Sequence, residues 1–304
     1  MTEIADVIKS VAAWAGQPIR ATPVTGGLTN RAFRVQVGDR AYFVSIPGER
    51  SELLAIRRAD EIHNTMAAAE TGVSPRVLHH DPRSGAIVVE FLQGRTLTPP
   101  DMHTPGMIER LAAAVRTLHS ARPFANRFDL FRLTDSYRRV LADDHLDPPE
   151  GFDGYPPLLA EMRAAVQAHP SPIRPCSNDL VPENLIDDGQ RLWIVDFGYS
   201  GNNDPCSELG NAVCEAAYDA AESEALCRAY FGEATSRLLS RMQLYAVMSD
   251  VAWSLWSVIQ ESISKLDVDF RAYGLKRWER ARGLLESGSL RSWIRAAGEW
   301  TSED

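Results

Sequence analysis

The chain has 304 residues, of which 44% are hydrophobic, and it carries a formal net charge of −9 at pH 7. A chain of this length and composition can bury a sizeable core, as one large domain or two smaller ones. The excess of acidic residues argues against a nucleic-acid partner, because phosphate backbones are bound by basic surfaces.

We expect neither a membrane span nor a secretion signal in this sequence. No uninterrupted apolar run approaches the about 18 residues of a membrane span, and the acidic N-terminal segment lacks the regions of a signal peptide. The cysteines are Cys176, Cys206, Cys214 and Cys227. They form no C-x-x-C pair and do not have the spacing of zinc ligands. We therefore expect reduced thiols in a cytoplasmic protein, and the sequence is compatible with a homodimer.

The first 92 residues are rich in predicted strands. Apolar spacing predicts a helix over 4–14 and another over 53–71. Between them, segments 31–37 and 41–46 read as a β-hairpin, and a third β-branched run covers 86–91.

Beyond Gly94 the sequence predicts mainly helices. They are expected over 107–119, 157–168, 206–220 and 234–264, with short strands around 185–186 and 192–195. This pattern predicts an α+β fold with two lobes, a small antiparallel-sheet N-lobe at 1–92 that binds the nucleotide and a larger helical C-lobe at 93–304.

The strongest chemical signal is a loop that contains Asp179 and Asn184, followed after a short apolar run by Asp196 in an Asp-Phe-Gly tripeptide. Phosphoryl transfer needs a carboxylate to receive the substrate hydroxyl and oxygen ligands for Mg²⁺ beside the nucleotide phosphates. The spacing and order match the catalytic loop and Asp-Phe-Gly motif of protein kinases. Asp179 is therefore the candidate proton acceptor, and Asn184 and Asp196 are the candidate metal ligands.

A second signal is the glycine-containing turn Gly26-Gly27-Leu28-Thr29-Asn30. Glycines let a backbone approach phosphate oxygens, and the two polar side chains can donate hydrogen bonds. On spacing alone, a plain strand-entry turn is the better interpretation, because Gly-Gly turns are frequent.

Taken together, these motifs resemble the choline/ethanolamine kinases, within the wider group of aminoglycoside-phosphotransferase-like small-molecule kinases. The resemblance covers most of the chain. It includes the glycine turn, the catalytic loop and Asp196-Phe197. It continues through Glu208-Leu209-Gly210-Asn211 with Glu215, and through the block Trp253 to Gln260, with Tyr273 and Arg277 in register.

The resemblance implies a protein-kinase-like fold that uses ATP and Mg²⁺ to phosphorylate a small cationic alcohol. On the nucleotide side it assigns phosphate contacts to Gly26, Gly27, Thr29 and Asn30. It assigns the inter-lobe hinge to Glu90 and Phe91, and an ion pair with a strand cation to Glu61.

On the substrate side, the resemblance implies an aromatic cage for an ammonium group. Such groups are recognised by aromatic faces, each contributing about 0.5–2 kcal/mol. Helical spacing alone would place Trp253 and Trp256 in a core. The candidate substrate residues are Tyr199, Glu208, Glu215, Trp253, Trp256 and Tyr273, with Glu208 alternatively bracing the catalytic loop. Val268 stands where relatives often carry an aromatic residue.

Three positions depart from the family pattern. Ser177 replaces a histidine that buttresses the catalytic loop, and Gly198 replaces an acidic residue after Asp-Phe. Ser45 replaces the strand cation that contacts the nucleotide phosphates, a loss worth roughly 3 kcal/mol of transition-state stabilisation. The candidate substitutes for that cation are Arg34, Arg50 and Arg57.

The interpretation of function is an ATP-dependent choline or ethanolamine kinase. An aminoglycoside or aminosugar phosphotransferase is the enzymatic alternative, favoured by the acidic segment 204–215. A catalytically weak, kinase-like ligand-binding protein is the non-enzymatic alternative, favoured by Ser45 and Ser177. We interpret His119 as a structural residue and not a metal ligand, because no second His or Cys stands at ligand spacing.

Overall fold

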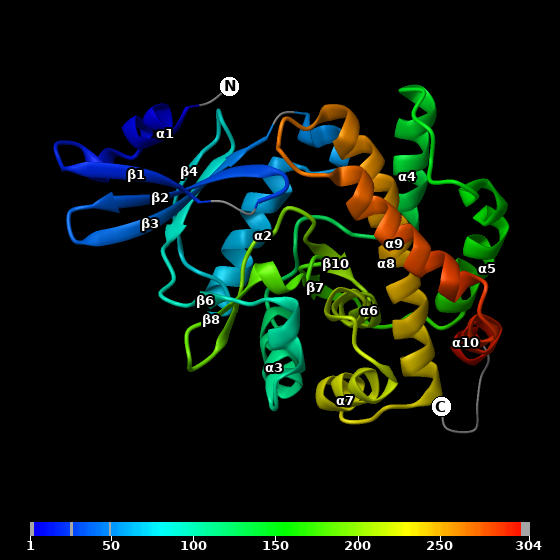
Figure 1. The fold of residues 1–304 in the computed structure, drawn as a ribbon. Coiled ribbons are helices and arrows are strands. Elements are labelled where there is room, and N and C mark those ends of the chain that lie inside the picture. Colours follow the sequence, from blue (N-terminus) through cyan, green and yellow to red (C-terminus); the bar gives the residue numbers. More distant parts are fainter. Residues whose placement is uncertain (1–2, 25–26, 49, 299–304) are drawn as a thin grey trace.

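The computed structural model describes residues 3–24, 27–48 and 50–298. Its N-terminal part is an antiparallel sheet with strand order β1-β2-β3-β5-β4 (Figure 1). Alternation along β2 and β3 buries Val35, Val37, Val44 and Ile46 against Trp14 and the residues of helix α1. The elements are α1 (Ile4–Ser10), β1 (Ile19–Val24), β2 (Asn30–Val37), β3 (Arg40–Pro47), β4 (Val77–Asp81) and β5 (Ala86–Glu90).

Helix α2 (Arg58–Glu70) lies between this sheet and the helical part of the molecule (Figure 1). Its buried residues Ala67 and Ala68 belong to the same apolar core as the C-terminal helices, whereas the α1 face of the sheet has a core of its own. The packing therefore joins α2 to the helices. The proposed division at residue 92 follows the chain order and stays a prediction.

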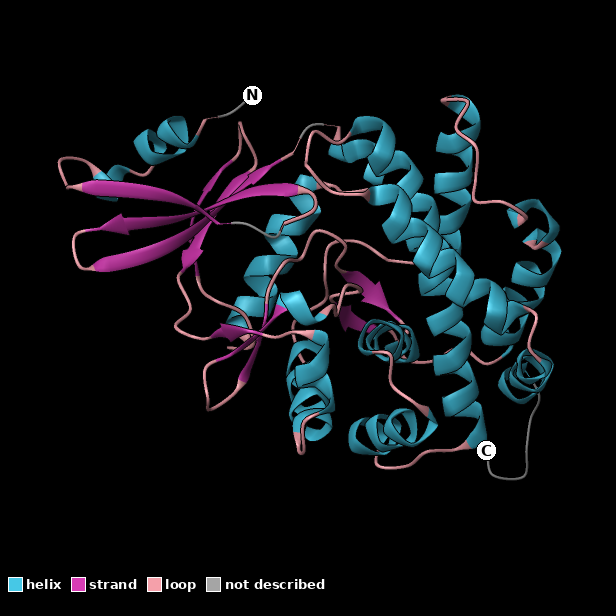
Figure 2. Cartoon of the chain, viewed as in Figure 1, coloured by secondary structure: helices cyan, strands magenta, loops and turns pink. Residues whose placement is uncertain are grey.

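The helical part is built around the long helix α8, which contacts α4, α6, α9 and α10. Figure 2 shows these helices surrounding only short strands. Among the described residues, no helix is both long enough and apolar enough to cross a membrane. The helices are α3 (Met107–His119), α4 (Leu130–Asp143), α5 (Pro156–Ala168), α6 (Pro205–Ala216), α7 (Ala220–Phe231), α8 (Ser236–Ile263), α9 (Phe270–Leu285) and α10 (Gly288–Gly298).

The candidate catalytic residues lie between α5 and α6 in the chain, in loops that adjoin the strands of two small sheets. One pairs β7 with β10, and the other has the order β6-β8-β9. A 3-10 turn, Pro182–Asn184, lies between β7 and β8. Because β8 pairs with β9, the loop around Asp179 and the segment that follows β9 lie side by side. The strands are β6 (Arg95–Thr96), β7 (Arg174–Cys176), β8 (Leu185–Asp187), β9 (Leu192–Ile194) and β10 (Gly201–Asn203).

The fold class is confirmed, and most predicted elements are present. The predicted helix 206–220 is wrong as one element, because the chain turns at Ala217 with φ 54° and then starts α7. The predicted helix 4–14 stops at Ser10, and the predicted helix 53–71 begins only at Arg58, after a 3-10 turn over Ser51–Leu54.

Candidate active site

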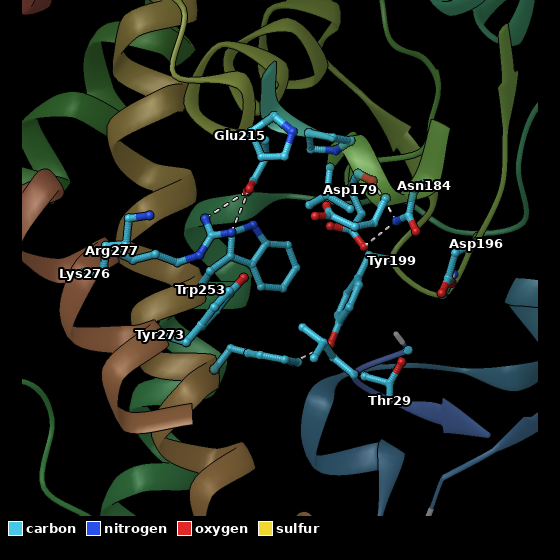
Figure 3. A pocket seen from close by; sticks show the side chains of 18 of the residues that line it. Thr29, Asp179, Asn184, Asp196, Tyr199, Glu215, Trp253, Tyr273, Lys276 and Arg277 are labelled. Carbon is cyan, nitrogen blue, oxygen red and sulfur yellow. Dashed lines mark hydrogen bonds and ion pairs between the residues drawn. The ribbon is translucent and has the colours of Figure 1, made fainter. Parts of the chain in front are cut away.

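A cavity of about 420 Å³ lies where the glycine turn, the catalytic loop and helices α8 and α9 meet (Figure 3). Ten predicted residues line it, from both parts of the molecule. They are Gly27, Thr29, Asp179, Asn184, Asp196, Tyr199, Glu215, Trp253, Trp256 and Tyr273.

The candidate catalytic triad is assembled at one end of the cavity. The amide nitrogen of Asn184 donates to the backbone carbonyl of Asp179 at 3.0 Å and to its carboxylate Oδ2 at 3.1 Å. This leaves the amide oxygen of Asn184 available as a metal ligand. Asp196 approaches from the end of β9, and its Oδ1 accepts the N–H of Gly198 at 3.1 Å (Figure 3).

The carboxyl groups of the triad are poorly compensated. Desolvation raises the pKa of Asp179 well above its usual value, and the negative charges of Asp196 and Glu215 raise it further. Asp196 is open to the cavity, yet the protein around it limits its solvation and raises its pKa. Crowded oxygen ligands of this kind fit a divalent cation, which would neutralise the charges that the protein leaves unpaired.

Glu208 is the exception among the predicted substrate residues. It does not line the cavity but is fully buried behind the catalytic loop. Its carboxylate accepts the backbone N–H groups of Ser177 at 2.9 Å and Asn178 at 2.7 Å. Of the two roles predicted for Glu208, the structure therefore places it to brace the loop.

Glu208 belongs to a buried cluster with His119 and Cys176, whose potential ligand atoms lie within 4.8 Å of one another. Nδ1 of His119 lies 2.6 Å from the Tyr230 hydroxyl, and its Nε2 lies 3.4 Å from Cys176 Sγ. Burial lowers the pKa of His119 to about 3 and raises that of Cys176. A neutral imidazole and a protonated thiol fit a structural cluster under the loop.

The opposite end of the cavity is aromatic. The Tyr199 and Trp253 rings are 4.7 Å apart, the Trp253 and Trp256 rings 6.1 Å, and the Trp256 and Tyr273 rings 5.9 Å, all in edge-on arrangements. The indole N–H of Trp256 donates to the Tyr199 hydroxyl at 2.6 Å, which fixes both rings. Val268 is exposed and is not among the described residues that line the cavity.

Charged residues on α9 adjoin this aromatic end, and sequence reasoning gave them no role. Arg277 binds the Glu215 carboxylate through two hydrogen bonds of 2.8 and 2.7 Å and lies 4.6 Å from the Tyr273 ring centre. Arg280 binds Asp250, while Lys276 is exposed and forms no ion pair with the described residues. The spacing 273, 276, 277 and 280 is the available signal, since it places all four on one helix face.

On the nucleotide side, the structure corrects the expected partner of Glu61. Glu61 binds Arg58 of its own helix at 2.6 Å, and not a cation on the hairpin strand. Arg58 also donates to the Asn30 side chain at 3.1 Å. Sequence reasoning missed Arg58, although an Arg three residues before a Glu on a helix is a readable signal. Gly26 lies outside the described residues.

The predicted hinge residues Glu90 and Phe91 are not among the described residues that line the cavity. Their backbone N–H groups donate to the carbonyls of Arg76 at 3.1 Å and Ala41 at 3.4 Å. The Glu90 side chain binds Arg76 at the surface. A contact with an adenine base would therefore fall to the hinge carbonyl groups or to the residues that follow.

The model of the phosphotransferase enzyme family matches residues 20–245. A crystal structure of a choline/ethanolamine kinase family protein from Mesorhizobium loti is 36% identical, with a TM-score of 0.83, covering 97% of this chain and 99% of that one. Choline kinase LicA from Streptococcus pneumoniae is 23% identical with a TM-score of 0.78, covering 92% and 98% of the two chains. Ethanolamine kinase 2 of Mus musculus is 25% identical over 300 residues, which cover 88% of this chain and 76% of the relative.

Proposed function

The chain belongs to the phosphotransferase enzyme family and, within it, to the choline/ethanolamine kinases, and from that membership we propose that it transfers a phosphoryl group from ATP to the hydroxyl of choline, with ethanolamine as a second acceptor. The observation that carries this proposal is the aromatic end of the cavity, which lies in the same cavity as Asp179. A quaternary ammonium has no hydrogen to donate, so aromatic faces are the groups that recognise it.

The chemistry assigned to the protein is mostly positioning. The hydroxyl oxygen attacks the γ-phosphorus, the bond to the ADP oxygen breaks, and the hydroxyl proton passes to the Asp179 carboxylate. While it is ionised, a carboxylate whose pKa is raised, as that of Asp179 is, accepts a proton more readily than a free aspartate. Asn184 holds that carboxylate in place through its amide nitrogen.

Asn184 and Asp196 would hold Mg²⁺, which when bound neutralises charge on the phosphate oxygens. The ligand set of one amide and one carboxylate oxygen leaves room for phosphate oxygens and water, as Mg²⁺ prefers. Gly198 supplies no third protein ligand, and its own N–H is used to orient Asp196.

The charges at the aromatic end of the cavity disfavour the aminoglycoside alternative. Polyamine substrates require unpaired carboxylates, but Glu215 is paired with Arg277, and Asp250 with Arg280. Lys276, which forms no ion pair with the described residues, adds a positive charge to the same wall. A small acceptor with one ammonium group, held by aromatic faces, matches this wall better than a polycation.

The proposal is tested by Mg²⁺-dependent ATP consumption in the presence of choline, ethanolamine or kanamycin. We expect turnover with choline or ethanolamine and none above background with kanamycin. Absence of turnover with both amino alcohols, despite measurable choline binding, would contradict the kinase assignment.

Variants of Trp256 test the cage in the same assay. Trp256→Leu should raise the KM for choline about tenfold, because it removes one cation–π face, and should leave the KM for ATP unchanged. Trp256→Phe should retain much of the affinity, and Trp293→Leu on α10, outside the cavity, serves as the matched control. An unchanged choline KM in Trp256→Leu would refute the cage.

A further inference from the structure

We propose that Arg58, at the start of α2, binds the nucleotide phosphates in this chain and takes over the task of the strand cation that Ser45 replaces. The proposal rests on the proposed function only in assuming a nucleotide as phosphoryl donor. It does not depend on the identity of the alcohol.

The first argument is position. Ser45 lies within β3, paired with Ala32 of β2 and Ile87 of β5, and its hydroxyl carries no charge. The guanidinium of Arg58 lies 3.1 Å from the Asn30 side chain, which directly follows the cavity-lining Thr29. Arg58 thus stands behind the glycine turn.

Arg58 also faces the metal-binding side of the site. Glu61, which binds Arg58 at 2.6 Å, lines a small cavity together with Gly198, and the Gly198 N–H donates to the Asp196 carboxylate at 3.1 Å. One region is therefore bordered by the glycine turn, Arg58 and Asp196. Phosphates held by the turn and by a cation on Asp196 would occupy it.

The second argument is preorganisation. Glu61 fixes one end of the guanidinium with a bond of 2.6 Å, and the Arg58 side chain is only 19% exposed. Its stem packs at the β4–β5 turn, where a Cβ added to Gly85 would lie 3.6 Å from Arg58 Cγ. A cation fixed in advance can stabilise developing charge without reorganisation.

Arg58 retains unused donors. A guanidinium has five N–H groups, and its bonds within the protein go to Glu61 and Asn30. Its Nε is buried and has no hydrogen-bond partner among the described residues. The planar fork of arginine suits phosphate oxygens.

The arginines suggested by the sequence lie elsewhere. The Arg34 side chain is exposed, and its guanidinium lies 5.0 Å from the Phe91 ring centre. Arg50 is 54% exposed and approaches Asp144 at 3.9 Å, and Arg57 is 79% exposed and pairs with Asp60. The side chains of these three arginines make no described hydrogen bond or ion pair with the glycine turn or with Glu61. Only the backbone carbonyl of Arg57 reaches Glu61, whose N–H it accepts at 3.0 Å in the first turn of α2.

The test is the dissociation constant of ATP and of adenosine, measured by titration calorimetry without an acceptor. Arg58→Ala should weaken ATP at least tenfold and leave adenosine within twofold of wild type, because only the phosphates meet the arginine. Arg57→Ala, the exposed neighbour, should change neither constant. ATP affinity within twofold of wild type in Arg58→Ala would overturn the proposal, as would an equal loss of ATP and adenosine affinity.

Two further variants make the test robust. Arg58→Gln/Glu61→Gln removes both charges while a hydrogen bond between the side chains remains feasible, so it answers the same question if Arg58→Ala does not fold. Arg58→Ala/Ser45→Arg should regain ATP affinity, and no recovery would refute the claim that the two positions serve the same phosphates. Failure of the wild type to bind ATP would instead overturn the proposed function itself.

Discussion

At the scale of single residues, two positions beside the triad residues adopt a left-handed backbone. Asn178 and Asp196 have positive φ angles of 61° and 64°. Outside glycine, Asn and Asp adopt this conformation most readily, and side-chain contacts hold it at Asn178. The Asn178 amide donates to the Tyr199 carbonyl at 3.0 Å, and Glu208 accepts the Asn178 N–H. These buried contacts fix the conformation of the loop that carries Asp179.

The buried carboxyl group of Glu208 should make the free energy of unfolding depend on pH. Burial raises its pKa to about 7, although the two N–H donors oppose the shift. Because the unfolded pKa is near 4.5, the folded state binds more protons between pH 4.5 and 7. The free energy of unfolding should therefore fall as pH rises through this window, by a Glu208 contribution on the order of 3 kcal/mol.

The measurement is urea unfolding at pH 5 and pH 7.5 in wild type and Glu208→Gln. Glutamine does not titrate, so the fall in stability with pH should be smaller in the variant. The same pH dependence in both proteins would show that Glu208 does not have the raised pKa.

The residues of the triad could be predicted because their spacing lies within one short segment of sequence. The phosphate cation could not, because the expected position was a strand and Arg58 is on a helix. Likewise, nothing in the sequence shows that Glu208 receives two backbone N–H groups, since backbone donors carry no sequence signature.

At the scale of elements, the aromatic end of the cavity depends on a close crossing of α8 and α9. A Cβ added to Gly274 would lie 2.8 Å from Ser257 Cβ and 3.3 Å from the Ser254 carbonyl. This approach brings Tyr273 against Trp256. Glycine is required there for space, not for backbone conformation.

We therefore predict that Gly274→Ala lowers the free energy of unfolding by about 1–3 kcal/mol through overpacking, and that it raises the KM for choline by displacing Tyr273. The check is denaturant unfolding combined with steady-state kinetics. Gly283→Ala on the same helix, with open space at its Cβ, should be neutral or stabilising by up to about 1 kcal/mol. Equal stability of Gly274→Ala and wild type would refute the crossing.

Apolar spacing predicted the helices that became α3 and α5 because each buries a regular stripe. The helix that became α8 was also predicted, but it is buried on nearly all sides between Ser240 and Gln260. Apolar spacing did not predict the break between α6 and α7. Ala217 adopts a left-handed conformation there, and no glycine or proline in the sequence indicates the turn. Tertiary packing sets that turn, since Tyr218 is buried and its hydroxyl donates to the Met102 carbonyl at 3.0 Å.

At the scale of the whole molecule, buried amide groups connect α2 to the catalytic loop. Asn64 of α2 donates to Asn126 at 2.9 Å and to the Ser200 hydroxyl at 3.0 Å. The carbonyl of Tyr199, one residue earlier, accepts from Asn178. The helix that carries Arg58 and Glu61 is thereby fixed relative to the triad.

A second connection joins helix α8 to the glycine turn. Gln260 of α8, one turn beyond Trp256, donates to the backbone carbonyl of Leu28 in the glycine turn at 3.0 Å. The helix that carries the aromatic residues thus supports the glycine turn directly. Such contacts between distant segments explain why local sequence pattern alone does not predict which residues line one cavity.

The most direct test of the account is the turnover number of Asp179→Ala with Mg²⁺, ATP and choline, alongside its dissociation constant for ATP. If Asp179 receives the hydroxyl proton, the turnover number should fall by roughly 10²–10⁴-fold, while ATP binds nearly as in wild type. Turnover within a few-fold of wild type would contradict the assigned role of Asp179 and, with it, the catalytic centre described for this chain.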